Sequence, residues 1–241
     1  MTLEKIQADF DRLAQFDDDG WNHNNHYIPY LLSRAPVPCP ESLEIGCGTG
    51  MLARLLAQRS GHVLALDLSP QMIRMAQQRS TGYTNITYEV GDVLAMNFPA
   101  HSFDCIVSVA TLHHMAMDAI LLKVKDTLKP GGALLVLDLY QSEGLTDIAY
   151  DFASFVVSTA IKLIKGRVRQ SPEQRAAWEE HGRTDHYLKI SEVQLVCAKL
   201  LPGARVRKHL MWRYSIVWTK PASRVALVQP RQHTRRNIPD M

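Results

Sequence analysis

A glycine-rich turn at residues 42–51 constrains the fold of this 241-residue chain more than any other segment. An apolar run is followed by glycines at every second position, Gly46, Gly48 and Gly50, and then by good helix formers. This order predicts a strand, a tight turn and a helix. Because glycine has no Cβ, a ligand can lie directly on the backbone N–H groups of such a turn. Glu44, two residues before the first glycine, favours a cationic, amine-bearing ligand over a pyrophosphate.

Apolar, strand-like runs alternate with amphipathic helical patterns over the central part of the chain. The expected strands are Ser42–Ile45, Val63–Leu68, Ile86–Val90, Phe103–Val109 and Ala133–Leu139. The expected helices between them are Met51–Gln58, Pro70–Arg79 and Ala119–Leu128. This alternation predicts an α/β, Rossmann-like fold, with a mostly parallel sheet that is covered by helices on both faces.

The N-terminal segment precedes this core. Apolar residues recur at helical spacing over Leu3–Phe16, which predicts a first helix. A polar, aromatic segment follows, Trp21–Tyr30, and then a short helix and a proline-rich linker, Ala35–Pro40. His23 and His26 lie three residues apart, but no acid accompanies them, so we expect no metal site there.

Residues 141–190 break the alternation of strands and helices. Their apolar stretch, residues 148–164, is too short and too charged to cross a bilayer, and predicts a helical cap over the sheet. Contact with a membrane surface is the alternative. A helix with Ser191 as its N-cap and two closing strands, Arg205–Leu210 and Tyr214–Thr219, complete the fold. The resulting division is an N-terminal lid segment (1–40), the cofactor-binding core (41–140), the cap insertion (141–190), the C-terminal part of the sheet (191–222) and a basic tail (223–241).

The composition, 46% hydrophobic and 21% charged residues, is typical of one soluble globular domain with an insertion. The start of the chain has no cationic region followed by an apolar core, so we expect a cytoplasmic protein. The four cysteines form no Cys-x-x-Cys pair, which argues against a disulfide framework or a zinc–thiolate site. Residues 201–241 hold nine Lys/Arg and one acid. We interpret this charge as a solvated face and tail, with nucleic-acid binding as the alternative.

Acidic residues stand at the ends of two further strands, where ligands bind in open α/β sheets. Asp67 follows the second strand, 21 positions after Gly46, and a carboxylate there can accept both hydroxyls of a ribose. Asp92 follows the third strand after Gly91, and can accept an adenine amino group.

Two classes of ligand compete for such a site. A nicotinamide dinucleotide requires a third glycine where Met51 stands, and Glu44 would face its phosphate. An adenosyl sulfonium that carries an amino acid fits better, with its ammonium near Glu44 and the backbone of Gly46 and its ribose on Asp67. Its adenine is then expected beside Leu68, Met72 and Val93.

Ordered motifs run along the core: Glu44-Ile45-Gly46-Cys47-Gly48-Thr49-Gly50, Asp67-Leu68-Ser69-Pro70-Gln71-Met72, Gly91-Asp92, Ser102-Phe103-Asp104, Leu112-His113-His114 and Leu128-Lys129-Pro130-Gly131-Gly132. They resemble those of class I S-adenosylmethionine-dependent methyltransferases, in the branch that includes the ubiquinone/menaquinone-type enzymes. The resemblance covers Glu41–Leu139. It implies S-adenosyl-L-methionine as the cofactor and a seven-stranded sheet whose last strand is antiparallel. It does not extend to the N-terminal segment or to the insertion, which in this family usually shape the acceptor pocket.

The expected cofactor-binding residues come from the glycine turn, the strand ends and the N-terminal lid. They are Tyr27, Glu44, Gly46, Cys47, Gly48, Gly50, Asp67, Leu68, Met72, Gly91, Asp92, Val93 and Ala110. Tyr27 is placed near the methionine carboxylate by the hypothesis that the N-terminal segment covers the cofactor.

The candidate catalytic residues are His113 and His114, just past the end of the fourth strand. An oxygen or nitrogen acceptor must lose a proton, and a histidine suits that task. Paired histidines also recur here across the family with many acceptors, so a contact to the cofactor is the alternative role. Asp138 and Tyr140, at the fifth strand end, are either substrate contacts or simply the end of a strand.

These patterns predict a methyltransferase that acts on a small molecule by in-line displacement and releases S-adenosylhomocysteine. The aromatic cap residues favour an apolar or aromatic acceptor: Tyr150, Phe152, Phe155, Trp178 and Tyr187. The alternatives are cyclisation or another tailoring step on a natural product, a binding protein without activity, and a nucleic-acid methyltransferase. The last is disfavoured because Ala110-Thr111-Leu112-His113 stands where an Asn-Pro-Pro-Tyr-like sequence would be expected.

Overall fold

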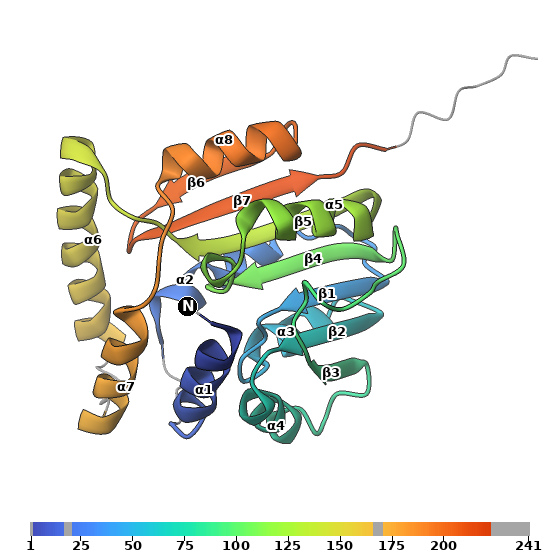
Figure 1. The fold of residues 1–241 in the computed structure, drawn as a ribbon, viewed down its shortest axis with the longest axis horizontal. Helices are drawn as coiled ribbons and strands as arrows, with labels where there is room; N and C mark the ends of the chain where they lie inside the picture. Colours follow the sequence, from blue (N-terminus) through green and yellow to red (C-terminus); the bar gives the residue numbers. More distant parts are fainter. Residues whose placement is uncertain (1, 17–20, 166–170, 223–241) are drawn as a thin grey trace, which may run out of the picture.

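The computed structural model describes residues 2–16, 21–165 and 171–222, so the predicted basic tail, residues 223–241, lies outside the described part. One sheet of seven strands has the order β3-β2-β1-β4-β5-β7-β6 (Figure 1). The strands are β1 (Glu41–Ile45), β2 (His62–Asp67), β3 (Ile86–Val90), β4 (Phe103–Val109), β5 (Leu128–Leu139), β6 (Arg205–His209) and β7 (Arg213–Thr219). Strands β1 to β5 pair in parallel, and β7 is antiparallel to β5 and β6. The predicted α/β fold is confirmed.

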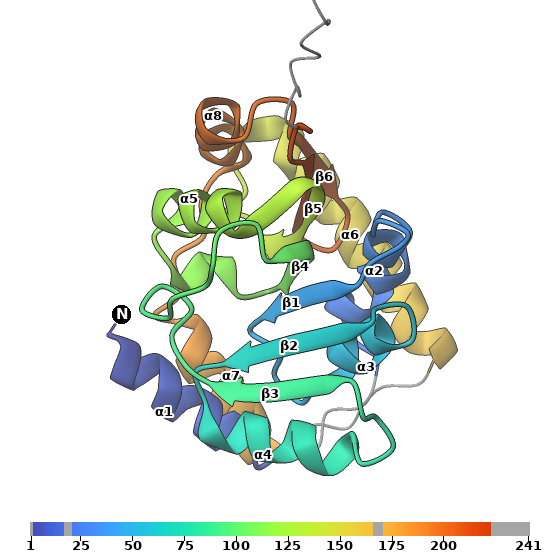
Figure 2. The ribbon, with the colours of Figure 1, turned by 90° about the vertical axis from the view of Figure 1, so that its right-hand side faces the viewer.

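Helices cover both faces of the sheet (Figure 2). They are α1 (Leu3–Leu13), α2 (His23–Leu32), α3 (Met51–Ala57), α4 (Pro70–Arg79), α5 (Met117–Thr127), α6 (Gly144–Lys165), α7 (Pro172–Gly182) and α8 (Ile190–Leu200). One apolar core contains buried residues of α5 and α8, and the other contains buried residues of α2 and α3. Alternate residues of β5 belong to each core, as the two-residue period of a strand requires.

Three helices outside the strand–helix alternation gather at the carboxyl edge of the parallel strands (Figure 1). Helices α6 and α7 form the predicted insertion between β5 and α8, and α1 packs against both α7 and α4. The first helix and α7 of the insertion therefore meet, although more than 150 residues of sequence separate them. None of the described helices combines the length and the apolar character needed to span a membrane.

Several expected boundaries differ from the structure. The polar segment that precedes the first strand is itself helix α2, because the Asn22 side chain accepts the N–H groups of Asn24 and Asn25 at 2.9 Å. Ser191 is not an N-cap: α8 begins one residue earlier, and the Glu192 carboxylate accepts the Lys189 N–H at 2.8 Å.

Candidate active site

A cavity of about 700 Å³ lies at the carboxyl edge of the sheet. Its floor is formed by the loops after β1, β2, β3 and β4, which carry most of the predicted cofactor residues. Its roof is formed by α1, α2 and α7. Apolar side chains of the first helix line this roof: Leu3, Ile6, Phe10, Leu13 and, just past the helix end, Phe16. The N-terminal segment is therefore part of the cavity wall.

The glycine turn after β1 leaves its backbone open to the cavity. Gly46 has a φ of +74°, and a Cβ at this position would lie 2.1 Å from the Thr111 hydroxyl oxygen, so only glycine fits. Gly48, with a φ of +51°, faces open space. Gly50 does not line the cavity and instead packs closely, because a Cβ there would lie 2.5 Å from the Tyr88 hydroxyl. Gly50 has a φ of +77° and is the N-cap of α3, so its role in this structure is to allow the helix to begin there.

Glu44 is a buried carboxylate at the wall of the cavity. Its side chain is 3% exposed, and among the described residues its Oε2 atom has no hydrogen-bond partner. Burial, together with the nearby Asp67 carboxylate, raises the pKa of Glu44 well above its usual range. A buried carboxylate without a partner at the wall of a cavity is complementary to a cationic ligand group.

Asp67 is held in place at the end of β2. One carboxylate oxygen accepts the Gly48 N–H at 2.8 Å, and the other accepts the Ser69 N–H at 2.9 Å. Burial raises the pKa of Asp67 despite these donors. Because each carboxylate oxygen retains a lone pair, the group can still accept hydroxyls of a ligand.

The remaining predicted floor residues also converge on this cavity. They are Cys47, Leu68, Met72, Gly91, Asp92, Val93 and Ala110. Asp92 is partly engaged, since its Oδ1 atom accepts the Leu94 N–H at 2.9 Å.

Tyr27, like Gly50, is a predicted cofactor residue that the structure places outside the cavity lining. Its hydroxyl donates to the Leu210 carbonyl at 3.1 Å. The cavity is lined by Asn24, Asn25 and Ile28 of the same helix. With about 100° of rotation per residue, Tyr27 points away from the face that these three side chains share.

The histidine after β4 is oriented by a buried carboxylate. Asp138, at the end of β5, accepts His113 Nδ1–H at 2.6 Å and the His113 backbone N–H at 3.0 Å. An ionised carboxylate can only accept, so the proton lies on Nδ1 and the Nε2 atom of His113 keeps its lone pair. Asp138 is thus a positioning residue for His113. Tyr140, the other candidate at this strand end, is absent from the cavity lining.

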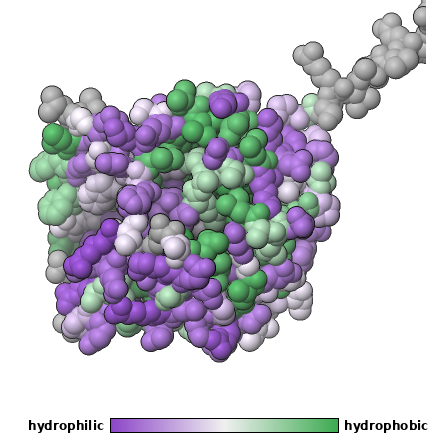
Figure 3. Space-filling view, viewed as in Figure 1, coloured by the Kyte–Doolittle hydropathy of each residue, from purple (hydrophilic) through white to green (hydrophobic). Residues whose placement is uncertain are grey.

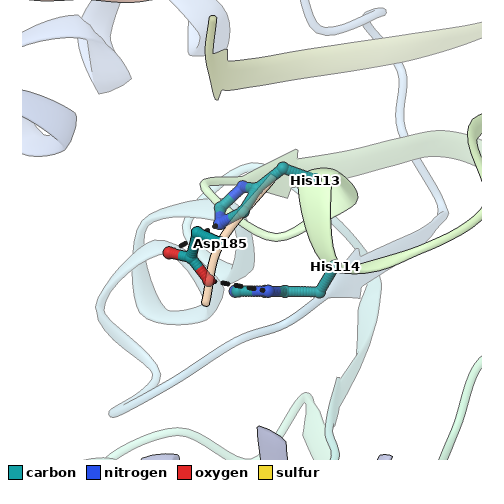
Figure 4. Close-up of side chains that lie close together, drawn as sticks. All are labelled: His113, His114 and Asp185. Carbon is teal, nitrogen blue, oxygen red and sulfur yellow. Dashed lines mark ion pairs between the residues drawn. The ribbon is translucent and has the colours of Figure 1, made fainter. Parts of the chain in front are cut away.

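The insertion brings two side chains to these histidines that sequence reasoning missed. Asp185 Oδ1 lies 3.6 Å from His114 Nδ1, and Asp185 Oδ2 lies 3.8 Å from His113 Nε2 (Figure 4). His181 approaches the same Oδ2 atom at 3.7 Å. Burial and the neighbouring His113 lower the pKa of His114 to about 4, which makes His114 a weak base. The sequence did contain one indication of this pair, because His181 and Asp185 are four residues apart. Site residues were predicted from the ends of strands, however, and the insertion contains no strand of the sheet.

The expected aromatic contribution of the insertion is only partly correct. Trp178 and Tyr187 line the cavity. Tyr150, Phe152 and Phe155 belong to α6 and are exposed to solvent, and apolar side chains gather over this helix in Figure 3. These three residues are wrong as acceptor contacts in this structure, because α6 lies at the outer edge of the cap and α1 supplies the apolar wall.

Comparison with known proteins identifies the family. A family described as "Methyltransferase domain" matches residues 43–132. An uncharacterised methyltransferase of Mycobacterium tuberculosis is 31% identical over 205 residues, which cover 85% of this chain and 99% of the relative. The chain belongs to the class I S-adenosylmethionine-dependent methyltransferases. A ubiquinone biosynthesis O-methyltransferase of Xylella fastidiosa is 29% identical to this methyltransferase over 193 residues, which cover 73% of this chain and 77% of the other.

Solved structures agree with the fold of the methyltransferase. The N-methyltransferase NodS from Bradyrhizobium japonicum, in complex with S-adenosylhomocysteine, superposes with a TM-score of 0.61 at 18% identity over 89% of this chain and 98% of that one. A SAM-dependent methyltransferase from Aquifex aeolicus superposes with a TM-score of 0.54 at 17% identity, over 90% and 96% of the two chains.

The cofactor of the methyltransferase is S-adenosylmethionine, and the residues present fit it. The unpartnered Glu44 Oε2 suits the ammonium, and the backbone exposed by Gly46 and Gly48 can contact the amino-acid portion. Asp67 suits the ribose hydroxyls, and Leu68, Met72 and Val93 offer apolar surface for the adenine. We propose these contacts for each residue.

Proposed function

We propose that the methyltransferase acts on a small-molecule acceptor that enters beside the histidines after β4. The observation that supports this proposal is that one cavity contains both the cofactor residues and the candidate catalytic residues. The same 700 Å³ cavity is lined by the glycine turn, by His113 and His114, and by α1 and α7 above them. A volume of this size suits the cofactor and one small acceptor.

The acceptor side of the cavity combines apolar walls with polar groups. Phe10, Met115 and Trp178 offer apolar surface, while Tyr187 and Arg213 bring polar groups. This supports an acceptor with an apolar body and an ionisable hydroxyl, amine or carboxyl group. His113 and His114 stand on this side, and we assign them to activation of the attacking atom.

S-adenosylhomocysteine formation tests this function directly. Phenols, amines and carboxylic acids of up to about 20 non-hydrogen atoms are supplied with S-adenosylmethionine, and RNA and DNA are supplied in parallel at low and high salt. We expect stoichiometric product with at least one small-molecule class. Turnover that requires RNA or DNA and falls with salt would instead support a nucleic-acid methyltransferase. Cofactor consumption with a ring-closed or otherwise unmethylated product would support the tailoring alternative.

Removal of the first helix tests its role in closing the cavity. Asp11 fixes α1 to the start of α4, accepting the Ser69 hydroxyl at 2.5 Å and the Gln71 N–H at 3.1 Å. Deletion of residues 1–16 exposes the reacting groups to water, so we expect cofactor affinity to fall about tenfold and turnover to fall further. Calorimetric titration measures the first effect and S-adenosylhomocysteine release the second.

A substitution on the outer face of α1 provides the matched control. Arg12→Ala removes an exposed ion pair with Glu180 (2.7 Å) but leaves the cavity wall intact. Exposed pairs contribute about 0.2–1 kcal/mol, so both affinity and turnover should stay near wild type. Unchanged cofactor affinity in a folded deletion variant would show that α1 does not cover the cofactor.

A further inference from the structure

His113, His114 and Asp185 form a buried cluster whose side chains come from two separate parts of the chain (Figure 4). One ligand-type atom from each residue lies within 4.8 Å of the others. The three side chains are between 4% and 6% exposed. The cluster borders the cavity, so a small ligand can reach it from the acceptor side.

Hydrogen bonds inside the described structure account for only part of this arrangement: Asp185 Oδ2 accepts the Tyr187 hydroxyl at 2.8 Å, and His113 Nδ1 pairs with Asp138 at 2.6 Å. The distances from Asp185 to His113 and His114, 3.8 and 3.6 Å, exceed hydrogen-bond length. Among the described residues, His114 Nε2 and Asp185 Oδ1 are buried and have no hydrogen-bond partner. Leaving such an atom unpaired costs about 1–3 kcal/mol, so a bound group that contacts Asp185 Oδ1 would stabilise the cluster. The imidazole atom that faces this oxygen is His114 Nδ1, at 3.6 Å.

The ligand types and the supporting residues are those of a metal site. Two ligands at about 2.1 Å from a tetrahedral ion lie about 3.4 Å apart, so the three side chains, which now approach to within 4.8 Å, would close slightly around an ion. Asp138 holds His113 through Nδ1, so that Nε2 is free to coordinate. Carboxylates that orient the far nitrogen of a histidine are the usual support for a metal-bound histidine. His181 lies beside Asp185 and also has a carboxylate at its far nitrogen. Its Nε2 atom is 3.7 Å from Asp185 Oδ2, and its Nδ1 atom is 3.3 Å from Asp9.

We propose that His113, His114 and Asp185 bind one divalent transition-metal ion of the Zn²⁺ type, with an open position toward the acceptor. Two imidazoles and one carboxylate are the ligand set of many catalytic zinc sites, whereas Mg²⁺ and Ca²⁺ favour oxygen ligands. The proposal rests on the proposed function for its chemistry. An acceptor oxygen bound at the open position would lose its proton to solvent and form the O–CH₃ bond. The C–S bond would break as the O–CH₃ bond forms, and its electron pair would stay on sulfur, giving S-adenosylhomocysteine.

The test is a metal titration on the tag-free, full-length chain after dialysis against a chelator. Co²⁺ is followed by its visible absorption and Zn²⁺ by calorimetry. We expect one ion per chain for wild type, and at least a tenfold loss of affinity in Asp185→Asn and His114→Ala. Asp138→Asn should lose about 10- to 100-fold through misorientation of His113. His186→Ala, an exposed histidine next to Asp185, is the matched control and should bind like wild type.

Measurements of cofactor binding distinguish failure of the metal-site proposal from failure of the proposed function. Asp185→Asn should retain wild-type affinity for S-adenosylmethionine, which also shows that the variant is folded. Absence of stoichiometric binding by wild type, or equal affinity in all variants, would overturn the metal site. A thiolate-to-cobalt absorption band would do the same by placing the ion on buried cysteines. If wild type binds metal but neither binds the cofactor nor releases S-adenosylhomocysteine, the proposed function fails and the metal site stands.

Discussion

Replacing Glu44 with Gln is expected to weaken S-adenosylmethionine binding by about 30- to 150-fold. The Glu44 Oε2 atom is buried and unpartnered among the described residues, and we assign it to the cofactor's ammonium. Removing one member of a buried charge pair costs about 2–3 kcal/mol or more, and about 1.4 kcal/mol corresponds to a factor of ten in affinity. Gln keeps the size of the side chain, so the loss reports the charge. Calorimetric titration with S-adenosylmethionine measures it.

The same substitution should stabilise the cofactor-free protein. The pKa of Glu44 is raised by burial and by Asp67, so the folded state binds a proton more tightly than the unfolded state. Stability contributed by this position therefore falls as pH rises from the normal glutamate value toward the folded pKa, and the loss is constant above it. Thermal unfolding should show a higher midpoint for Glu44→Gln than for wild type, with a larger difference at pH 8 than at pH 5. A lower midpoint combined with unchanged cofactor affinity would refute the assignment.

The control substitution lies on the same sheet. Glu41→Gln changes a partly exposed carboxylate that pairs with His62 at 3.2 Å. Glu41 is at the amino end of β1 and does not line the cavity. Neither cofactor affinity nor the thermal midpoint should change appreciably, because exposed pairs contribute little.

The cofactor half of the site could be predicted because local rules determine it. Glycine spacing fixes where the backbone turns, and the parallel sheet brings the ends of β1, β2 and β3 to one edge. Consequently Glu44, Asp67 and Asp92 meet in the cavity although they are far apart in the chain. Strands β3 and β4 and helix α4 also have the predicted bounds, since each is a clear apolar run or amphipathic pattern between turn residues.

The acceptor half depends on tertiary packing that no local pattern encodes. Tyr27 and Phe155 were chosen as aromatic residues in suitable segments, but the rotation of α2 and the outer position of α6 direct both away from the cavity. Asp185 and His181 reach the site only because α7 packs against α1. Asp138 was considered as a strand end, and its part in orienting His113 became visible only with the fold.

Removal of the His113 side chain should reduce turnover about 10²- to 10⁴-fold and leave cofactor affinity within about threefold of wild type. The effect is expected to be large because His113 Nε2 would use its lone pair in either role, to coordinate a metal ion or to accept a proton directly. His113→Ala is measured as S-adenosylhomocysteine release with an acceptor that the screen of phenols, amines and carboxylic acids identifies. Near-normal turnover in this variant would exclude both roles.

The neighbouring substitutions separate the two roles. If a metal ion activates the acceptor, His114→Ala should reduce turnover about as much as His113→Ala, because both are ligands. If His113 alone takes the proton, His114→Ala should have a much smaller effect. Asp138→Asn offers His113 Nδ1 an amide in place of a carboxylate, which favours the tautomer with the proton on Nε2 and should reduce turnover by at least about 100-fold in either case. The ¹⁵N chemical shifts of the His113 ring report that tautomer without any acceptor. An unchanged tautomer together with normal turnover would show that Asp138 does not orient His113.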